Sequence, residues 1–299
     1  MLEELKSFIA VIDEASLTRA ADALCVSQSA VSKRIQRLEA LLGTDLFDRN
    51  SKPPRPNSFA SRVYEEAVPL LGAMERLLNL AREDATPSGT FRFGLPQIVA
   101  DIALVDAVMS LKAGFPALDL RLHTDWSASL QQMIEAGALD SAVLMLPKGT
   151  TPHEGLSARH VSVLEVLVVQ SKRKPLVKPR TTIKALATQD WVLNPLGCGY
   201  RAALERAIDR KGQRLRLSVD THGAGTQLQL VSAGVGLGLV PKGVLARSDM
   251  KKDLQVVDVS DFKLSVDLWL VHPRQTGNLK PAIDLISDSV VASFERYSS

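Results

Sequence analysis

The sequence has 299 residues, of which 45% are hydrophobic and 23% charged, and its formal net charge is +3. This composition is typical of a globular chain of two or three domains and excludes wholesale disorder. So small a net charge does not by itself indicate a nucleic-acid partner. No uninterrupted apolar run reaches the roughly 18 residues that span a membrane, and the N-terminal segment is too charged for a signal peptide. We therefore expect a cytoplasmic protein with no membrane partner.

The first 43 residues are predicted to form three helices. Residues 2–14 place Leu5, Phe8 and Ile12 on one helical face. Ser16 and Ser27 can each cap a following helix with the side-chain oxygen. The third helix, 28–42, is predicted to end at a glycine, Gly43.

The third helix has two different faces. Val31, Ile35, Leu38 and Leu42 form an apolar stripe, and short polar and basic side chains lie on the other side. Two short helices joined by a tight turn, the second with such an outer face, are typical of a helix-turn-helix. Residues 46–57 then read as a short strand and a proline-rich, basic wing.

From Ser58 to about Asp84 the apolar residues recur at alternating intervals of three and four. This is the spacing of a coiled-coil seam, so we expect the helix to pair with a second copy. Thr86–Gly89, which contains proline and glycine, marks a linker after it. The residues predicted to lie in the dimer seam are Phe59, Val63, Leu70, Met74 and Leu77.

The remaining residues, 90–299, alternate short apolar strands with helical stretches. This alternation predicts α/β sheets with right-handed crossovers, and the length is comfortable for two small lobes. The glycine run Gly234–Gly238 follows a predicted helix, whereas a phosphate-binding loop follows a strand. Cys25 and Cys198 lie far apart, and the five histidines have no metal-ligand spacing. We expect no enzyme activity, no metal and no cofactor.

The segment from Ser16 to Arg49 resembles the N-terminal signature of LysR-type transcriptional regulators. The matching residues include Thr18–Ala21, Val26–Gln28, Arg37–Glu39, and Leu46–Phe47 followed by Arg49. Further along, FRFG, FPALDLRLHT and LVSAGVGLGLVP occur in the order and spacing of that family. The resemblance implies a winged helix-turn-helix, a dimerising linker helix and an effector domain of two α/β lobes, like a periplasmic binding protein.

The predicted fold class is α/β with an N-terminal all-α winged helix-turn-helix, a long linker helix and a two-lobed effector domain. The DNA-binding domain is placed at residues 1–58, the linker helix and hinge at 59–89, and the effector domain at 90–299. Within the effector domain, lobe I comprises residues 90–161 and 267–299, and lobe II comprises 162–266. The last helix, at about Pro281–Phe294, is expected to return to lobe I.

The basic residues of the N-terminal part gather in two acid-free stretches, which indicates a directed anionic partner. Side chains near the start of the third helix can reach base edges in the major groove, whereas other basic residues suit phosphates. The alternative is a solvated charged face. The predicted base-reading residues are Gln28, Ser29, Ser32 and Lys33, and the predicted phosphate contacts are Thr18, Arg19, Arg34, Arg37, Arg49 and Arg55.

Lobed α/β domains bind small molecules where strand ends face helix N-termini, and backbone N–H groups there favour anions. Arg201 can pair with a carboxylate, so we expect a small and anionic effector. Serine and threonine at helix starts also serve as simple caps. The predicted effector contacts are Pro96, Gln97, Ile98, Ser127 and Ser129 from one lobe, and Gly197, Cys198, Gly199, Arg201 and Thr226 from the other.

We predict a regulator that binds double-stranded promoter DNA as a homodimer or homotetramer and responds to a small molecule between the lobes. One alternative is a one-cysteine redox regulator. Cys198 precedes a predicted helix start and has Arg201 nearby, two features that lower the pKa of a thiol. A second alternative is a small-molecule-binding protein without DNA function, which the composition and the lobes would also fit. A third is a non-specific architectural DNA protein, which the basic stretches would also fit.

Overall fold

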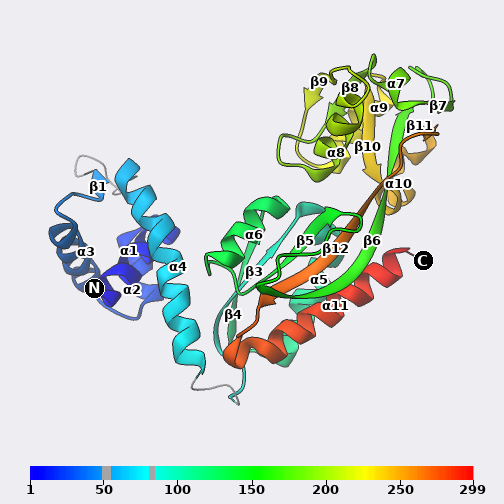
Figure 1. Ribbon diagram of the computed structural model, residues 1–299. Helices are drawn as coiled ribbons and strands as arrows, with labels where there is room; N and C mark the ends of the chain where they lie inside the picture. The colour runs from blue at the N-terminus through cyan, green and yellow to red at the C-terminus, as the bar shows by residue number, and fades with distance from the viewer. Residues whose placement is uncertain (49–54, 81–84, 299) are drawn as a thin grey trace. The chain divides into compact units, whose positions relative to one another are not determined.

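The computed structural model describes residues 1–48, 55–80 and 85–298 (Figure 1). The chain forms two compact units, one centred on residues 1–83 and the other containing most of the remaining chain. Within the residues described, no helix combines the length and the apolar character needed to cross a bilayer.

The N-terminal unit begins with α1 (Leu2–Glu14), α2 (Leu17–Ala23) and α3 (Gln28–Leu42). The predicted caps are confirmed: Ser16 Oγ accepts from Arg19 N at 3.3 Å, and Ser27 Oγ accepts from Ala30 N at 3.2 Å. Gly43 ends α3 with a φ of 68°. The turn between α2 and α3 has no glycine, and Cys25 takes the left-handed conformation there, with a φ of 53°.

The apolar stripe of α3 packs against α1 and α2. Val31, Ile35 and Leu38 are buried in a core that includes Phe8. Leu42, the last residue of α3, is 40% exposed, so the stripe extends beyond the buried core at its C-terminal end.

The wing and the long helix α4 follow. Strands β1 (Phe47–Asp48) and β2 (Arg55–Pro56) pair in antiparallel fashion. Asn57 Oδ1 accepts from Ala60 N at 2.9 Å and so caps α4 (Ser58–Leu80). Phe59, Val63 and Tyr64 pack against the helix-turn-helix core, whereas Leu70 and Leu77 are 55% and 65% exposed.

One sheet runs through the C-terminal unit, in the strand order β4-β3-β5-β12-β6-β10-β8-β9. At one end of that order β3 (Gly89–Leu95) lies parallel to β4 (Leu118–Thr124) and β5 (Ser141–Pro147). Helices α5 (Gln97–Gly114) and α6 (Ser127–Glu135) make the crossovers. These elements belong to lobe I.

Lobe II repeats the parallel arrangement. β8 (Asp190–Leu193) lies between β9 (Arg216–Asp220) and β10 (Leu237–Pro241), and both neighbours are parallel to it. Helices α8 (Gly199–Asp209) and α9 (Ala224–Ser232) connect them. The other elements of the C-terminal unit are β7 (Arg180–Thr181), α7 (Ile183–Leu186), α10 (Lys242–Arg247), β11 (Leu254–Val259) and two short 3-10 turns, Asp249–Lys252 and Gly277–Leu279.

Two long antiparallel strands, β6 (Leu156–Ser171) and β12 (Leu264–Pro273), pass from one lobe into the other (Figure 1). The C-terminal half of β6 also pairs with β10 and β11. Helix α11 (Lys280–Ser298) then packs on α5 through Ile283, Ile286 and Phe294, as the resemblance implies. The lobes are thus joined by two continuous strands, and a change in their relative orientation must act on those strands.

Candidate functional site

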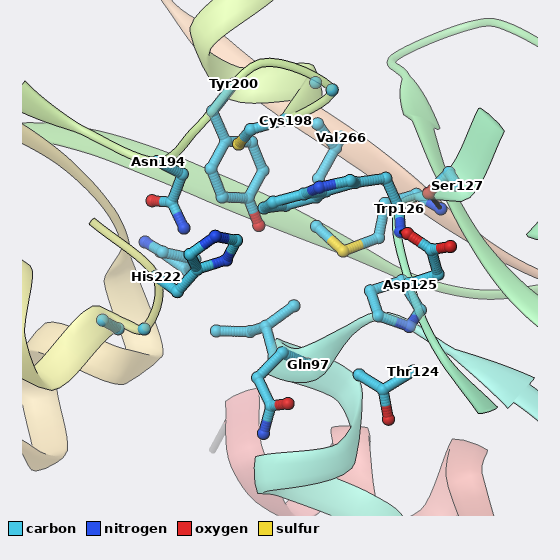
Figure 2. A pocket seen from close by; sticks show the side chains of 18 of the residues that line it. Gln97, Thr124, Asp125, Trp126, Ser127, Asn194, Cys198, Tyr200, His222 and Val266 are labelled. Atoms are coloured by element: carbon cyan, nitrogen blue, oxygen red, sulfur yellow. Dashed lines mark hydrogen bonds between the residues drawn. The ribbon is translucent and has the colours of Figure 1, made fainter. Parts of the chain in front are cut away.

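A cavity of about 530 Å³ lies in the C-terminal unit, where helices α5, α6, α8 and α9 begin (Figure 2). Lobe I contributes the turns after β3 and β4, and lobe II contributes the turns after β8 and β9. Met145 of β5 and Val266 of β12 also line it. The cavity therefore lies where parallel strands end and helices start, which is where α/β folds place their ligands.

Most of the residues predicted from the sequence to contact an effector lie in this lining. They are Pro96, Gln97, Ile98, Ser127, Gly197, Cys198 and Gly199. Ser127 also has a structural role, because its Oγ accepts from Met145 N at 2.8 Å. A hydroxyl that accepts one hydrogen bond can still donate another to a ligand.

Three of the predicted residues do not line the cavity. Ser129 Oγ donates to Asp125 Oδ2 at 2.6 Å, and Thr226 is exposed on α9. Arg201 Nε donates to Glu205 Oε1 at 2.8 Å, and its Nη1 donates to the Asn194 carbonyl at 3.3 Å. The guanidinium of Arg201 is therefore held by its own helix and the preceding loop.

Three aromatic residues that were not predicted from the sequence also line the cavity. Trp126 of lobe I and His222 of lobe II stack with ring centroids 6.4 Å apart and planes 28° apart. Tyr200 lies beside them, and Figure 2 shows its hydroxyl directed toward the space between the two rings. An aromatic residue just before or at a predicted helix start was the available signal for Trp126 and Tyr200.

Tyr200 is 9% exposed, and burial raises the pKa of its hydroxyl well above the usual range. Among the described residues its hydroxyl oxygen has no hydrogen-bond partner. A buried polar atom without a partner carries a free-energy penalty, and such atoms are rare in folded proteins. The Tyr200 hydroxyl is therefore an unsatisfied buried polar group beside the cavity.

Two carboxylates also line the cavity. Asp101 accepts from Gln97 Nε2 at 2.7 Å, and Asp125 accepts from the Trp126 N–H at 2.7 Å. Partial burial raises the pKa of Asp125, but the hydrogen bonds from Ser129 and the Trp126 backbone outweigh it and leave the pKa lowered. Asp125 is therefore ionised at neutral pH.

Cys198 corrects a sequence-based expectation. It precedes α8 and has Arg201 nearby, as predicted, but its side chain is buried and only 4% exposed. Burial raises the pKa of the thiol, and the N–H groups of Arg201 and Tyr200 and the charge of Arg201 do not compensate. The prediction of a lowered thiol pKa is wrong, because desolvation disfavours the thiolate more strongly than the helix start favours it.

The second candidate site is the start of α3 in the N-terminal unit. Gln28, Ser29 and Lys33 are exposed and Ser32 is half-buried. At about 100° per residue these four positions span an arc of about 140° that begins beside the buried stripe and extends away from it. An exposed row of amide, hydroxyl and ammonium groups is what a helix presents to base edges in a major groove.

The predicted phosphate contacts differ in their surroundings. Thr18 and Arg37 are exposed on the helices, and Arg55 is exposed on β2. Arg19 lies 3.5 Å from a carboxylate oxygen of Glu14, and Arg34 lies 3.2 Å from one of Glu3. Arg34 thus also ties α3 to α1. Arg49 lies outside the described residues.

Comparisons with known proteins agree over most of the chain. The family model "Bacterial regulatory helix-turn-helix protein, lysR family" matches residues 2–60, and the model "LysR substrate binding domain" matches residues 84–292. The chain is 26% identical over 274 residues to the HTH-type transcriptional regulator YeiE of Escherichia coli K12. This match covers 92% of each chain.

Solved structures of the same fold include the probable transcriptional regulator PA0477 from Pseudomonas aeruginosa. Its TM-score is 0.69 at 20% identity, with 97% of this chain and 96% of that chain covered. Full-length CbnR in complex with its target DNA has a TM-score of 0.60 at 18% identity, with 98% and 99% covered. This chain belongs to the LysR family: it is a DNA-binding transcriptional regulator with an effector-binding domain.

Proposed function

We propose that this regulator binds promoter DNA as a homodimer or homotetramer and that a small molecule in the described cavity sets its DNA affinity or DNA bending. The observation that carries the proposal is that both lobes line the cavity, with Trp126 on one side and His222 on the other. A ligand that contacts both lobes favours one arrangement of them. The ligand can change the free energy of DNA binding only to the extent that its affinities for the two arrangements differ.

In this proposal the exposed start of α3 reads base edges through Gln28, Ser29, Ser32 and Lys33. Thr18, Arg37, Arg49 and Arg55 contact phosphates, which orient the unit without specifying sequence. Arg19 and Arg34 join them by exchanging Glu14 and Glu3 for phosphate oxygens. The exposed Leu70 and Leu77 on α4 support pairing through that helix.

We also propose that the protein binds its small molecule without transforming it, and that it acts in the cytoplasm with the chromosome. The sequence predicted an anionic effector from the helix N-termini and from Arg201. Because Arg201 is hydrogen-bonded to Glu205 and the Asn194 carbonyl, only the helix N-termini still support that prediction. The cavity and its residues carry the effector proposal independently of the charge of the ligand.

The test uses a promoter fragment selected from the genome of the source organism by binding to the full chain. The affinity of the protein for this fragment is measured by gel shift, with and without the small molecules that pass through a dialysis membrane from an extract of the same cells. We expect the extract to change the affinity for wild type and to have no effect on Trp126→Ala. Leu122→Ala, a similar truncation of an exposed side chain on β4, is the control and should respond like wild type. An undiminished response in Trp126→Ala would refute the cavity as the effector site.

A further inference from the structure

The formal charges on the cavity lining are negative. Asp101 and Asp125 belong to the lining, and the described lining residues include neither lysine nor arginine. Their nearest hydrogen-bond donors are neutral: the Gln97 amide, the Trp126 N–H and the Ser129 hydroxyl. Neutral donors stabilise a carboxylate without cancelling its charge. His123, with Nε2 3.7 Å from Asp125 Oδ2, offsets it when protonated.

Aromatic rings line the same space. Trp126 and His222 stack with ring centroids 6.4 Å apart, and Tyr200 lies beside them (Figure 2). The face of an aromatic ring carries a negative quadrupole potential that attracts ammonium groups, and tryptophan attracts them most strongly. Carboxylates beside aromatic faces are therefore a combination suited to an organic cation.

The Tyr200 hydroxyl supplies the third element. It is buried, directed into the cavity and without a partner among the described residues. A phenolic oxygen accepts hydrogen bonds as well as donating them. An N–H group of a bound amine would satisfy this oxygen.

The helix N-termini act in the opposite direction, because each carries a positive partial charge of about half an elementary charge. Groups of the protein itself already interact with part of that positive field. The N–H groups of Tyr200 and Arg201 interact with Cys198. The full charge of Arg201 is paired with Glu205. With histidine counted as neutral, Asp101 and Asp125 therefore carry the only full formal charges among the described lining residues.

From these observations we infer that the effector is an organic cation, with an amine or ammonium group on a compact apolar or aromatic body. The inference rests on the proposed function, since it takes the cavity as the effector site. The ammonium group lies near Asp125 and Asp101, and the body packs between Trp126, Tyr200 and Met145.

The test compares three probes of one shape that differ in charge: phenethylamine, 3-phenylpropionate and 2-phenylethanol. Isothermal titration calorimetry on the full chain measures their affinities at up to millimolar concentrations. We expect phenethylamine to bind at least about tenfold more tightly than the other two, because only its ammonium group can form charge-assisted hydrogen bonds with Asp125 and Asp101. Asp125→Asn and Asp101→Asn should each weaken phenethylamine and leave 2-phenylethanol unchanged.

Asp119→Asn is the matched control, because Asp119 lies on β4 outside the lining and pairs with Arg121. Equal or tighter binding of 3-phenylpropionate, no binding of phenethylamine, or no effect of the two asparagine variants would overturn the inference. Trp126→Ala separates this failure from a failure of the proposed function. If the acid binds best and needs Trp126, the cavity remains the effector site and the ligand is an anion. If Trp126→Ala leaves the affinity of every probe unchanged, the proposed site itself is wrong.

Discussion

Trp126 and Gly197 lie in contact across the two lobes, and a Cβ atom at position 197 would stand 2.9 Å from Cδ1 of the tryptophan ring. Gly197 has a φ of +99°, a conformation that residues with a side chain rarely adopt. Both the space and the backbone therefore require glycine. The indole of Trp126 reaches the second lobe because Gly197 has no side chain.

Gly197→Ala is expected to destabilise the C-terminal unit by about 1–3 kcal/mol, because the strained backbone and the displaced Trp126 ring act together. Urea unfolding followed by circular dichroism measures the change. Gly199→Ala is the control. Nothing lies within 4 Å of a Cβ at that position, and Gly199 begins a helix. Equal destabilisation by both variants would show that the contact with Trp126 is unimportant.

Gln28→Ala and Ser32→Ala should reduce discrimination at individual base pairs by about 1–3 kcal/mol, because they remove hydrogen bonds to base edges. Arg37→Ala should weaken operator and scrambled DNA alike and lower the salt slope by about one unit. Binding to both DNAs at several salt concentrations tests this division. Gln132→Ala, on an exposed position of α6, is the control. A change of base preference in Arg37→Ala alone would reverse the assigned roles.

Replacing Leu70 and Leu77 together by aspartate should weaken dimer formation, because it would bury charge in an apolar interface. Both leucines are exposed within one chain, so the folded unit should tolerate the change. Sedimentation velocity measures the association. Ser61→Asp adds a charge on the opposite side of α4 and should leave the dimer intact. If the double variant stays dimeric, pairing runs through other surfaces.

Cys198 should react slowly with thiol reagents. Its raised pKa keeps the thiol protonated at about pH 8, and its burial blocks access, whereas Cys25 is exposed. We expect iodoacetamide to modify Cys25 at least about tenfold faster, as read by mass spectrometry. Modification of Cys198 should accelerate as pH rises toward the raised pKa, because the thiolate then forms.

The same cysteine decides the redox alternative. Peroxide should leave promoter binding of wild type unchanged, and Cys198→Ser should retain the response to effector. A gel shift with and without peroxide on both proteins measures this. A peroxide effect that disappears in Cys198→Ser would favour a one-cysteine redox regulator over a metabolite sensor.

The sequence by itself determined the local features of this protein. Ser16, Ser27 and Asn57 cap helices through hydrogen bonds to residues three positions away, and such short-range contacts can be read from neighbouring letters. The alternation of strands and helices likewise predicted the α/β lobes, because each strand carries its own apolar pattern. The LysR signature added the order of the domains.

Tertiary structure decided which side chains meet. Trp126 and His222 are far apart in sequence and come together because two different strands end at one cavity. Arg201 does not line that cavity, and its guanidinium is bound to Glu205 and the Asn194 carbonyl, although the spacing of Arg201 and Glu205 on one helix was a readable signal. The pKa of Cys198 depends on burial, which is a sum over distant neighbours that no local pattern contains.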